Sequence, residues 1–387
     1  MSSSESCPVC ASRQVEVFLR RDRVPVHQNL LLATAEAALQ VTRGNLHMAV
    51  CSSCGFVFNA AFDPLLLSYG KDYDNSQECS GCFTTYLEDI VRDLVETKGL
   101  RRSRIVEVGC GKGHFLRRLV ASSEGSTGVG FDPSYTGPDT DLGGRVAFRR
   151  EYYGPPAAQV PADAVVCRHV IEHVERPLDL LGAVRDAVSQ SPAARVFFET
   201  PCVEWILRER VVWDFFYEHC SLFSASSLQA GFQIAGFDIV EIEHRFGKQY
   251  LWIESRRSAE PGEPYLEPGD IPSLAKDFGR HEASLKSAWL ERIRGLRRHG
   301  RVALWGAGAK GTTFANLIDP HRTLVDCIVD VNPAKQGKYV PGSAHPIVFY
   351  QELRTRGVTC AVLMNPNYRT ENEELLRIAS IPVELIE

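Results

Sequence analysis

The sequence predicts an α/β protein with a doubly wound parallel sheet, a small module before that sheet and a second α/β domain after it. An apolar run, a glycine-rich turn and an amphipathic segment follow one another at residues 105–116, and segments typical of strands and helices then alternate up to residue 201. The same order of strand, turn and helix recurs at residues 301–314. Alternation of this kind places parallel strands side by side with helices on both faces.

The glycine-rich turn predicts a site for a nucleoside-bearing cofactor. It contains an acid and three glycines: Glu107, Gly109, Gly111 and Gly113. Glycine lets the backbone turn sharply and lets a ligand approach it. The next predicted strand ends at Asp132-Pro133, where a carboxylate can accept hydrogen bonds from both ribose hydroxyls. The turn alone could be only a tight connection, but strand, turn, helix and acid together favour the cofactor.

Composition narrows the function. A chain of 387 residues suggests about two or three domains, and a net charge of −5 argues weakly against a nucleic-acid substrate. The sequence has no apolar run of about 18 residues, and its first residues lack the basic and apolar regions of a signal peptide. We therefore expect a cytoplasmic enzyme with a small-molecule substrate and neither a nucleic-acid nor a membrane partner.

Two pairs of cysteines near the N-terminus predict a structural zinc site. Each pair has C-x2-C spacing, which presents two sulfurs to one ion, and the four residues are Cys7, Cys10, Cys51 and Cys54. A redox pair or unligated thiols are the alternatives. A third pair, Cys79 and Cys82, either replaces one of these pairs as zinc ligands or consists of unrelated thiols, which we favour.

The second glycine turn defines the C-terminal domain. Gly306, Gly308 and Gly311 approach the G-x-G-x-x-G pattern of dinucleotide sites, so NAD binding is one interpretation and a duplicated fold without a nucleotide is the other. Lys310 lies where a helix N-terminus can receive phosphate, or it is a solvated lysine. We divide the chain into a zinc-binding module (1–70), a core (71–258), a linker with a connecting helix (259–299) and a Rossmann-like C-terminal domain (300–387).

These features together resemble a known family, the three-domain S-adenosylmethionine-dependent sugar C-methyltransferases of deoxysugar biosynthesis. The E-x-G-x-G-x-G turn resembles the first motif of class I methyltransferases, and the V-D-x-N-P-x-K-x-G-K-Y segment at residues 329–339 is the most specific match. The resemblance implies S-adenosylmethionine near Glu107, Asp132 and His169. It also implies a nucleotidyl-4-keto-6-deoxyhexose, methylated at C3 and held with the help of Gly308, Lys310 and Asn332.

Methylation at such a carbon needs a base near the C–H bond and a donor or acid near the ketone oxygen, because an enolate must form before it attacks the methyl group. The E-H-x-S-x-F segment at residues 218–223 resembles the catalytic motif of this family. The resemblance implies that His219 is the base, that Glu218 orients the site and that His173 lies nearby. Two tyrosines complete the predicted catalytic set: Tyr73 and Tyr217.

Several alternatives remain at this stage. Glu218 and His219 could instead form a helix entry bound to backbone, and the pair His169 and His173 has helical spacing but no H-E-x-x-H metal motif. The chain could also be an O- or N-methyltransferase, an NAD-dependent oxidoreductase, or a binding partner with a degenerate core. Glu107, Asp132 and the Glu218–His219 pair argue against the degenerate core, because all four side chains are present.

Overall fold

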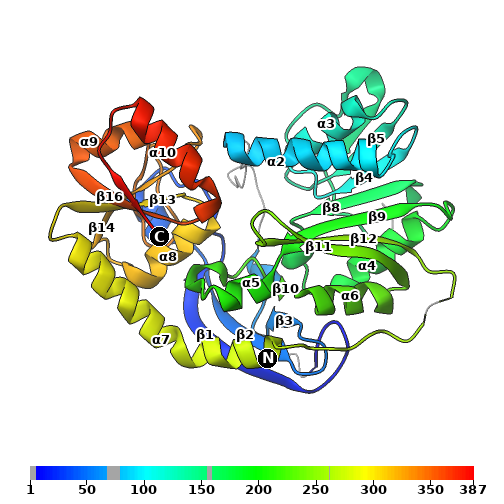
Figure 1. Cartoon of the computed structure of the whole chain (residues 1–387), viewed down its shortest axis with the longest axis horizontal. Helices are drawn as coiled ribbons and strands as arrows, with labels where there is room; N and C mark the ends of the chain where they lie inside the picture. Colours follow the sequence, from blue (N-terminus) through cyan, green and yellow to red (C-terminus); the bar gives the residue numbers. More distant parts are fainter. Residues whose placement is uncertain (1–5, 68–78, 155–158, 261) are drawn as a thin grey trace.

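The computed structural model describes residues 6–67, 79–154, 159–260 and 262–387, which form three β-sheets and the helices around them (Figure 1). Within these ranges no helix combines the length and the apolar character that crossing a lipid bilayer requires.

The N-terminal sheet is antiparallel and has the strand order β1-β2-β3-β10. Its first three strands are β1 (Val15–Pro25), β2 (Arg43–Cys51) and β3 (Val57–Asn59). The fourth, β10 (Ser221–Leu222), comes from the middle of the chain and pairs with β3. The predicted boundary at residue 70 therefore does not separate this sheet from the segment that follows.

The central sheet has eight strands in the order β11-β12-β9-β8-β4-β5-β7-β6. Strands β4, β5, β7, β8 and β9 are parallel, as the sequence predicts for a class I methyltransferase fold, whereas β6, β11 and β12 pair antiparallel at the two edges. The strands are β4 (Arg104–Val108), β5 (Thr127–Phe131), β6 (Thr140–Asp141), β7 (Val146–Arg149), β8 (Ala164–Arg168), β9 (Arg195–Pro201), β11 (Phe237–Arg245) and β12 (Tyr250–Arg257).

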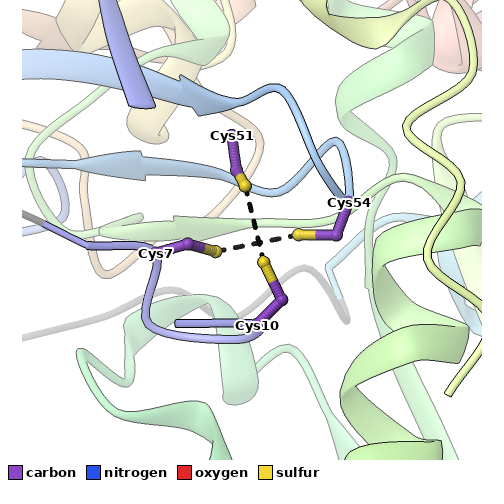
Figure 2. Close-up of side chains that lie close together, drawn as sticks. All are labelled: Cys7, Cys10, Cys51 and Cys54. Carbon is purple, nitrogen blue, oxygen red and sulfur yellow. Dashed lines mark hydrogen bonds between the residues drawn. The ribbon is translucent and has the colours of Figure 1, made fainter. Parts of the chain in front are cut away.

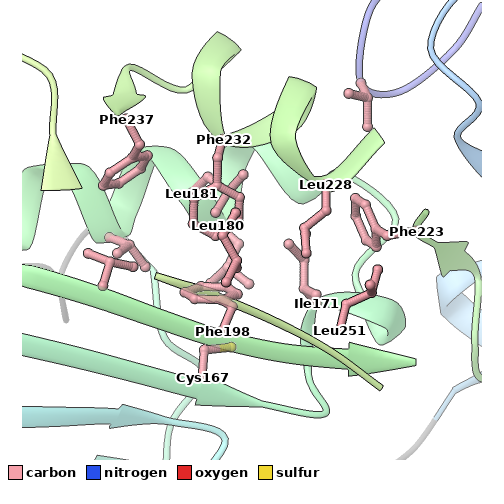
Figure 3. Close-up of a cluster of buried hydrophobic side chains, with 14 of the residues drawn as sticks. Cys167, Ile171, Leu180, Leu181, Phe198, Phe223, Leu228, Phe232, Phe237 and Leu251 are labelled. Atoms are coloured by element: carbon pink, nitrogen blue, oxygen red, sulfur yellow. The ribbon is translucent and has the colours of Figure 1, made fainter. Parts of the chain in front are cut away.

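Helices cover both faces of the central sheet (Figure 1). Helices α4 and α6 pack on one face, where Leu181 and Phe232 meet Phe198 of β9 in a fully buried core (Figure 3). Apolar residues at helical spacing thus form the helix that the sequence predicts between residues 178 and 188. The helices of this domain are α2 (Gly81–Arg92), α3 (His114–Ser122), α4 (Pro177–Ala187), α5 (Val203–Arg208) and α6 (Ala225–Ile234).

The C-terminal sheet is entirely parallel and has the order β15-β14-β13-β16-β17. Its elements are β13 (Arg301–Trp305), α8 (Ala309–Ile318), β14 (Val325–Val329), β15 (Ile347–Val348), α9 (Leu353–Arg356), β16 (Val358–Leu363), α10 (Arg369–Ile378) and β17 (Glu384–Ile386). Short elements elsewhere are α1 (Ala35–Leu39), η1 (Pro64–Leu66), η2 (Asp93–Thr97), η3 (Leu142–Gly144), η5 (Ile171–His173), η6 (Val212–Asp214), η7 (Tyr350–Glu352) and η8 (Pro366–Tyr368).

The connecting helix α7 (Ile271–Leu296) packs against both the N-terminal sheet and the C-terminal domain. Its first half packs against the N-terminal sheet, where Phe278 is buried, and its second half buries Ile293 in the core of the C-terminal domain (Figure 1). A Cβ atom at Gly279 would lie 2.0 Å from the carbonyl oxygen of Phe18, so only glycine allows this close approach. The helix therefore joins the two regions as a packed element.

Candidate active site

One cavity of about 260 Å³ joins the carboxyl ends of the two parallel sheets. In both sheets the strand order reverses beside the strand that carries the glycine turn, between β4 and β8 and between β13 and β16, and ligands of α/β proteins bind at such points. Three separate parts of the chain line the cavity: Asn29 of the N-terminal region; His169, Glu172, His173, Asp214, Phe216, His219, Gln249 and Tyr250 of the core; and Gly306, Gly308, Lys310, Asp330, Asn332, Lys335 and Asn365 of the C-terminal domain.

The first glycine turn is built for a close ligand at one position and for packing at two others. All three glycines have positive φ: 69° at Gly109, 53° at Gly111 and 77° at Gly113. A Cβ atom at Gly109 would lie 2.1 Å from Val170 Cγ2, and one at Gly113 would lie 2.4 Å from the Phe148 ring. At Gly111 no atom lies within 4 Å of that position. Gly111 therefore faces open space, which a ligand can use.

Asp132 is held beside this turn, as the sequence predicts. Its Oδ2 accepts a hydrogen bond from the Gly111 amide at 2.9 Å, and its Oδ1 accepts one from the Ser134 amide at 2.8 Å. Pro133 lies between Asp132 and Ser134, and Glu107 is buried near the end of β4. The turn does not line the cavity itself, but Val170, which covers Gly109, directly follows the cavity residue His169.

The segment that carries His219 is positioned by the N-terminal sheet. Ser221 pairs with Phe58 and Leu222 with Val57, and the Asn59 amide donates to the Cys220 carbonyl at 2.9 Å. Glu218 and His219 therefore stand in a turn that leads into β10, and the alternative of a helix entry is not observed.

The His219 ring lies between two other rings and near the Glu172 carboxylate. The Phe216 ring is 4.1 Å away and the His173 ring is 4.8 Å away and nearly perpendicular. Burial, followed by the charges of His173, His169 and Lys310, holds the pKa of His219 well below its usual value of 6.5. The imidazole is therefore neutral at neutral pH, so one ring nitrogen has a free lone pair, and the low pKa makes it a weak base.

His169 has the opposite character. Its backbone φ of 55° is unusual for a residue other than glycine, and its ring nitrogens face Glu172 Oε1 at 3.4 Å and Glu199 Oε2 at 3.3 Å. Burial lowers its pKa, but the two carboxylates outweigh burial and raise it to about 9. Glu199 also forms an ion pair with Arg168 and accepts a hydrogen bond from the Tyr86 hydroxyl. The two cations Arg168 and protonated His169 therefore balance the carboxylates of Glu172 and Glu199. When the surroundings of two titratable groups move their pKa values apart, the group with the higher pKa is suited to donate a proton and the other to accept one.

Glu218 holds the N-terminal region rather than lining the cavity. The side chain is fully buried, with Oε1 3.2 Å from His27 Nδ1, and its Oε2 accepts a hydrogen bond from the Gln28 amide at 2.8 Å. The Gln28 carbonyl in turn accepts a hydrogen bond from Thr312 of α8 at 3.1 Å. Glu218 thus connects the segment of the predicted base to both of the other regions.

Of the two predicted catalytic tyrosines, Tyr217 does not join this group. The Tyr217 hydroxyl accepts a hydrogen bond from the Asp63 amide at 2.8 Å, and its ring lies where a Cβ atom at Gly44 would be 2.3 Å away. These contacts keep Tyr217 outside the cavity, so it does not supply a hydroxyl to the site. Tyr73 lies outside the described residues.

The predicted substrate-binding residues Gly308, Lys310 and Asn332 all line the cavity. Lys310 is not simply solvated, because its Nζ lies 2.8 Å from Asp214 Oδ2 and 3.2 Å from Gln249 Oε1. Burial raises the pKa of Asp214, and the Lys310 ammonium opposes that effect. The ion pair joins the second glycine turn to the segment that leads to His219.

Several residues of the cavity were missed in the sequence. Asp214 lies five residues before His219 and Glu172 directly precedes His173, so closeness in the sequence to predicted site residues could have indicated both. Gln249 and Asn365 exchange two amide hydrogen bonds, of 2.9 and 3.1 Å, across the two domains. No local pattern distinguishes those two amides, because their contact depends on how the domains pack.

The four N-terminal cysteines converge on one point (Figure 2). The sulfurs of Cys7 and Cys54 are 3.7 Å apart, those of Cys10 and Cys51 are 3.5 Å apart, and all four lie within 4.8 Å of one another. Four thiolates in this arrangement fit a tetrahedral Zn²⁺ ion. The third pair lies elsewhere, since Cys79 lines the cavity and the Cys82 thiol donates to the Asn367 carbonyl.

Two family models match the chain. Residues 83–242 match the family described as a methyltransferase domain, and residues 270–378 match the family described as a C-methyltransferase C-terminal domain. None of the curated proteins matches the chain.

Solved structures of methyltransferases resemble less than half of the chain. A 1,6-didemethyltoxoflavin N1-methyltransferase of Burkholderia thailandensis is 14% identical over 44% of this chain and 78% of its own, with a TM-score of 0.35. An 8-amino-8-demethyl-D-riboflavin dimethyltransferase of Streptomyces davawensis is 24% identical over 46% of this chain and 56% of its own, with a TM-score of 0.35. A magnesium protoporphyrin IX methyltransferase of Synechocystis is 14% identical over 46% and 84%, with a TM-score of 0.36.

Proposed function

We propose that this chain, an S-adenosylmethionine-dependent methyltransferase, methylates a carbon atom beside a ketone and that His219 removes the proton from that carbon. The proposed acceptor is a nucleotide-linked 4-keto-6-deoxyhexose, methylated at C3. The match to a C-methyltransferase C-terminal domain supports carbon as the methylated atom.

The observation that carries this proposal is the position of the His219 ring in a cavity that reaches both strand-end sites. The cavity begins at the end of β8, beside the turn proposed for the cofactor, and extends to the second glycine turn. A methyl donor at the first turn and a nucleotide-linked acceptor at the second would thus meet near His219. Alignment is most of what the enzyme must supply, because a sulfonium methyl group is already activated.

In the proposed reaction, His219 Nε2 or Nδ1 takes the proton and the C–H electron pair forms the enolate. The enolate carbon then forms a bond to the methyl carbon, the methyl–sulfur bond breaks and its electron pair stays on sulfur. The His219 proton finally passes to solvent. The negative enolate would be stabilised by His169 and Lys310, two of the cations that line the cavity.

The remaining residues would hold the ligands. We propose that Glu107 and Asp132 bind the amino group and the ribose of S-adenosylmethionine, with Gly111 giving the ligand access to the backbone. Gly308, Lys310 and Asn332 would bind the acceptor. We also propose a structural Zn²⁺ ion at the four cysteines, which supplies no chemistry to the reaction and would fix the N-terminal sheet that positions β10.

The direct test is incubation with labelled S-adenosylmethionine and a panel of thymidine-diphosphate keto-sugars, with mass spectrometry of the products. Replacement His219→Gln should lower turnover by about 10²- to 10⁴-fold, as expected for loss of a general base. S-adenosylhomocysteine binding, measured by calorimetry, should persist. His244→Gln, at an exposed position of β11, is the matched control. Unchanged turnover in His219→Gln contradicts the proposal.

Solvent deuterium distinguishes this reaction from O- or N-methylation. An enolate-forming enzyme incorporates deuterium at the acceptor C–H without the methyl donor, and His219→Gln should stop that incorporation. Methyl transfer without deuterium incorporation would favour an oxygen or nitrogen acceptor.

A further inference from the structure

We propose that Glu172, His173 and His219 form a binding site for a divalent transition-metal ion, and that an ion bound there inhibits the enzyme. The site is separate from the four cysteines and lies inside the cavity.

The three side chains offer a suitable set of donor atoms. One ligand atom from each lies within 4.8 Å of the others, which gives two imidazole nitrogens and one carboxylate oxygen. This donor set binds Zn²⁺, Co²⁺ or Ni²⁺ and leaves further coordination positions open. A thiolate cluster such as the N-terminal one is closed, so the two sites differ in both ligand type and accessibility.

The backbone holds the two donor segments together. Glu172 and His173 lie in η5, and His219 directly precedes Cys220 and β10. The Cys220 thiol donates to the Glu172 carbonyl at 3.7 Å, and the Ser221 hydroxyl donates to the Val174 carbonyl at 2.7 Å. Because these contacts link one turn to the other, the donors are brought together before any ion binds.

Neighbouring side chains also orient the donors. The Thr200 hydroxyl donates to Glu172 Oε2 at 3.1 Å, while Oε1 lies 3.4 Å from His169 Nδ1, beyond the usual hydrogen-bond range. The Phe216 ring lies against His219. Hydrogen-bonding partners of this kind fix the orientation of metal ligands, and their loss typically costs about 10- to 100-fold in metal affinity.

The location gives the ion access and a consequence. All three donors line the cavity, so an ion can enter it and keep open positions for water or for the acceptor. A ring nitrogen that binds a metal has no lone pair for a proton. An ion at His219 would therefore block proton removal. This inhibition rests on the proposed function of His219, whereas the binding itself does not.

The test is a titration of the full-length protein with Co²⁺ after the four cysteines have been loaded with Zn²⁺. We expect one further Co²⁺ ion per chain, with a visible spectrum that lacks the thiolate-to-cobalt charge-transfer band. Glu172→Gln and His173→Gln should each weaken binding by at least about 100-fold, since loss of a supporting partner alone costs about 10- to 100-fold. Thr200→Val should weaken it by about 10-fold, and His244→Gln should leave it unchanged.

Binding of S-adenosylhomocysteine to each variant verifies that it is folded, and three separate substitutions keep the test decisive if one of them unfolds the chain. Absence of Co²⁺ beyond the cysteine site, or equal affinity in Glu172→Gln and wild type, overturns the proposal. Deuterium incorporation is measured on protein whose four cysteines hold Zn²⁺, with and without additional Zn²⁺. Loss of incorporation on adding Zn²⁺ supports inhibition. If incorporation is absent even without the ion while Co²⁺ binds, the proposed function fails and the metal site stands.

Discussion

The two glycine turns have the same local arrangement of strand, turn and acid, but they differ in one ion pair. Each ends the strand at which the order of its sheet reverses, and each has an acid after the next strand that accepts two amide hydrogen bonds. Asp132 accepts from Gly111 and Ser134, and Asp330 accepts from Ala307 at 2.9 Å and Asn332 at 2.8 Å. Among the residues that the structure describes, only Asp330 is also paired with a lysine, since Lys335 Nζ lies 3.3 Å from its Oδ2.

This difference shows that one sequence pattern serves two purposes. The lysine neutralises the Asp330 carboxylate, the group that would bind ribose in a dinucleotide site, which argues against NAD at the second turn. The glycines differ in the same sense. Gly111 faces open space, and at its counterpart Gly308 a Cβ atom would meet only Asn29 Oδ1, at 3.8 Å, whereas a Cβ atom at Gly311 would lie 1.9 Å from the Gly306 carbonyl oxygen, so Gly311 serves the contact between helix and strand.

The largest effect should come from the second glycine turn, where Asp330 is paired with Lys335. Replacement Asp330→Asn leaves the Lys335 ammonium buried without its carboxylate and should lower the free energy of unfolding by about 3–5 kcal/mol. Chemical denaturation measures this change. The double variant Asp330→Asn/Lys335→Met should recover most of the loss, and affinity for S-adenosylhomocysteine should be unchanged in both. A large loss of that affinity would contradict the separation of the two turns.

The matched change in the first glycine turn should mainly weaken binding of the cofactor. Asp132→Asn removes the charge from the proposed ribose contacts and should cost about 1.5–3 kcal/mol of cofactor binding, or about 10- to 100-fold in Kd. The free energy of unfolding should also fall, by about 1–3 kcal/mol, because the new NH2 group must face the Gly111 or the Ser134 amide, both of which donate to Asp132. Calorimetry with S-adenosylhomocysteine measures the affinity, and an unchanged Kd would exclude Asp132 from the site.

The strand ends beside the two turns also differ, and pH reveals the difference. His169 follows β8 and has a pKa of about 9, raised above the 6.5 of an unfolded chain, while the amide Asn365 follows β16. Protonation of His169 therefore stabilises the fold fully below pH 6.5, and this contribution is lost as the pH rises through 9. Denaturation midpoints should fall over that range, and His169→Gln should flatten the slope. An equal slope in both proteins would contradict this assignment.

The smallest effect should come from the neutral contact between the domains. Gln249→Ala removes the two amide hydrogen bonds to Asn365 and should cost about 0.5–1.5 kcal/mol. The double variant with Asn365→Ala should cost less than the sum of the two single variants, because the shared pair of hydrogen bonds is lost only once, while Asn365 also loses the hydrogen bond from the Asn367 amide. Denaturation of the single and double variants measures the coupling, and fully additive losses would contradict it.

The sequence revealed the features that depend on neighbouring residues. Both glycine turns, the acids after the next strands and the cysteine pairs have short spacings, so their geometry follows from local chain properties. The ion pair of Lys310 with Asp214, the burial of Tyr217 against Gly44 and the antiparallel edge of the central sheet depend on segments far apart in the chain. No local pattern specifies such contacts, which is why Tyr217 was placed in the site and Asp214 was not.

The pairing of β3 with β10 has a consequence for the synthesis of the protein. Phe58 leaves the ribosome long before Ser221, and helix α7, which covers β1 and β2, is made later still. The first sheet must therefore wait, with an unpaired edge and an uncovered apolar face, until most of the chain exists. We expect early binding of zinc to the cysteines to protect this nascent segment from aggregation. Truncation after residue 220 should yield an insoluble fragment.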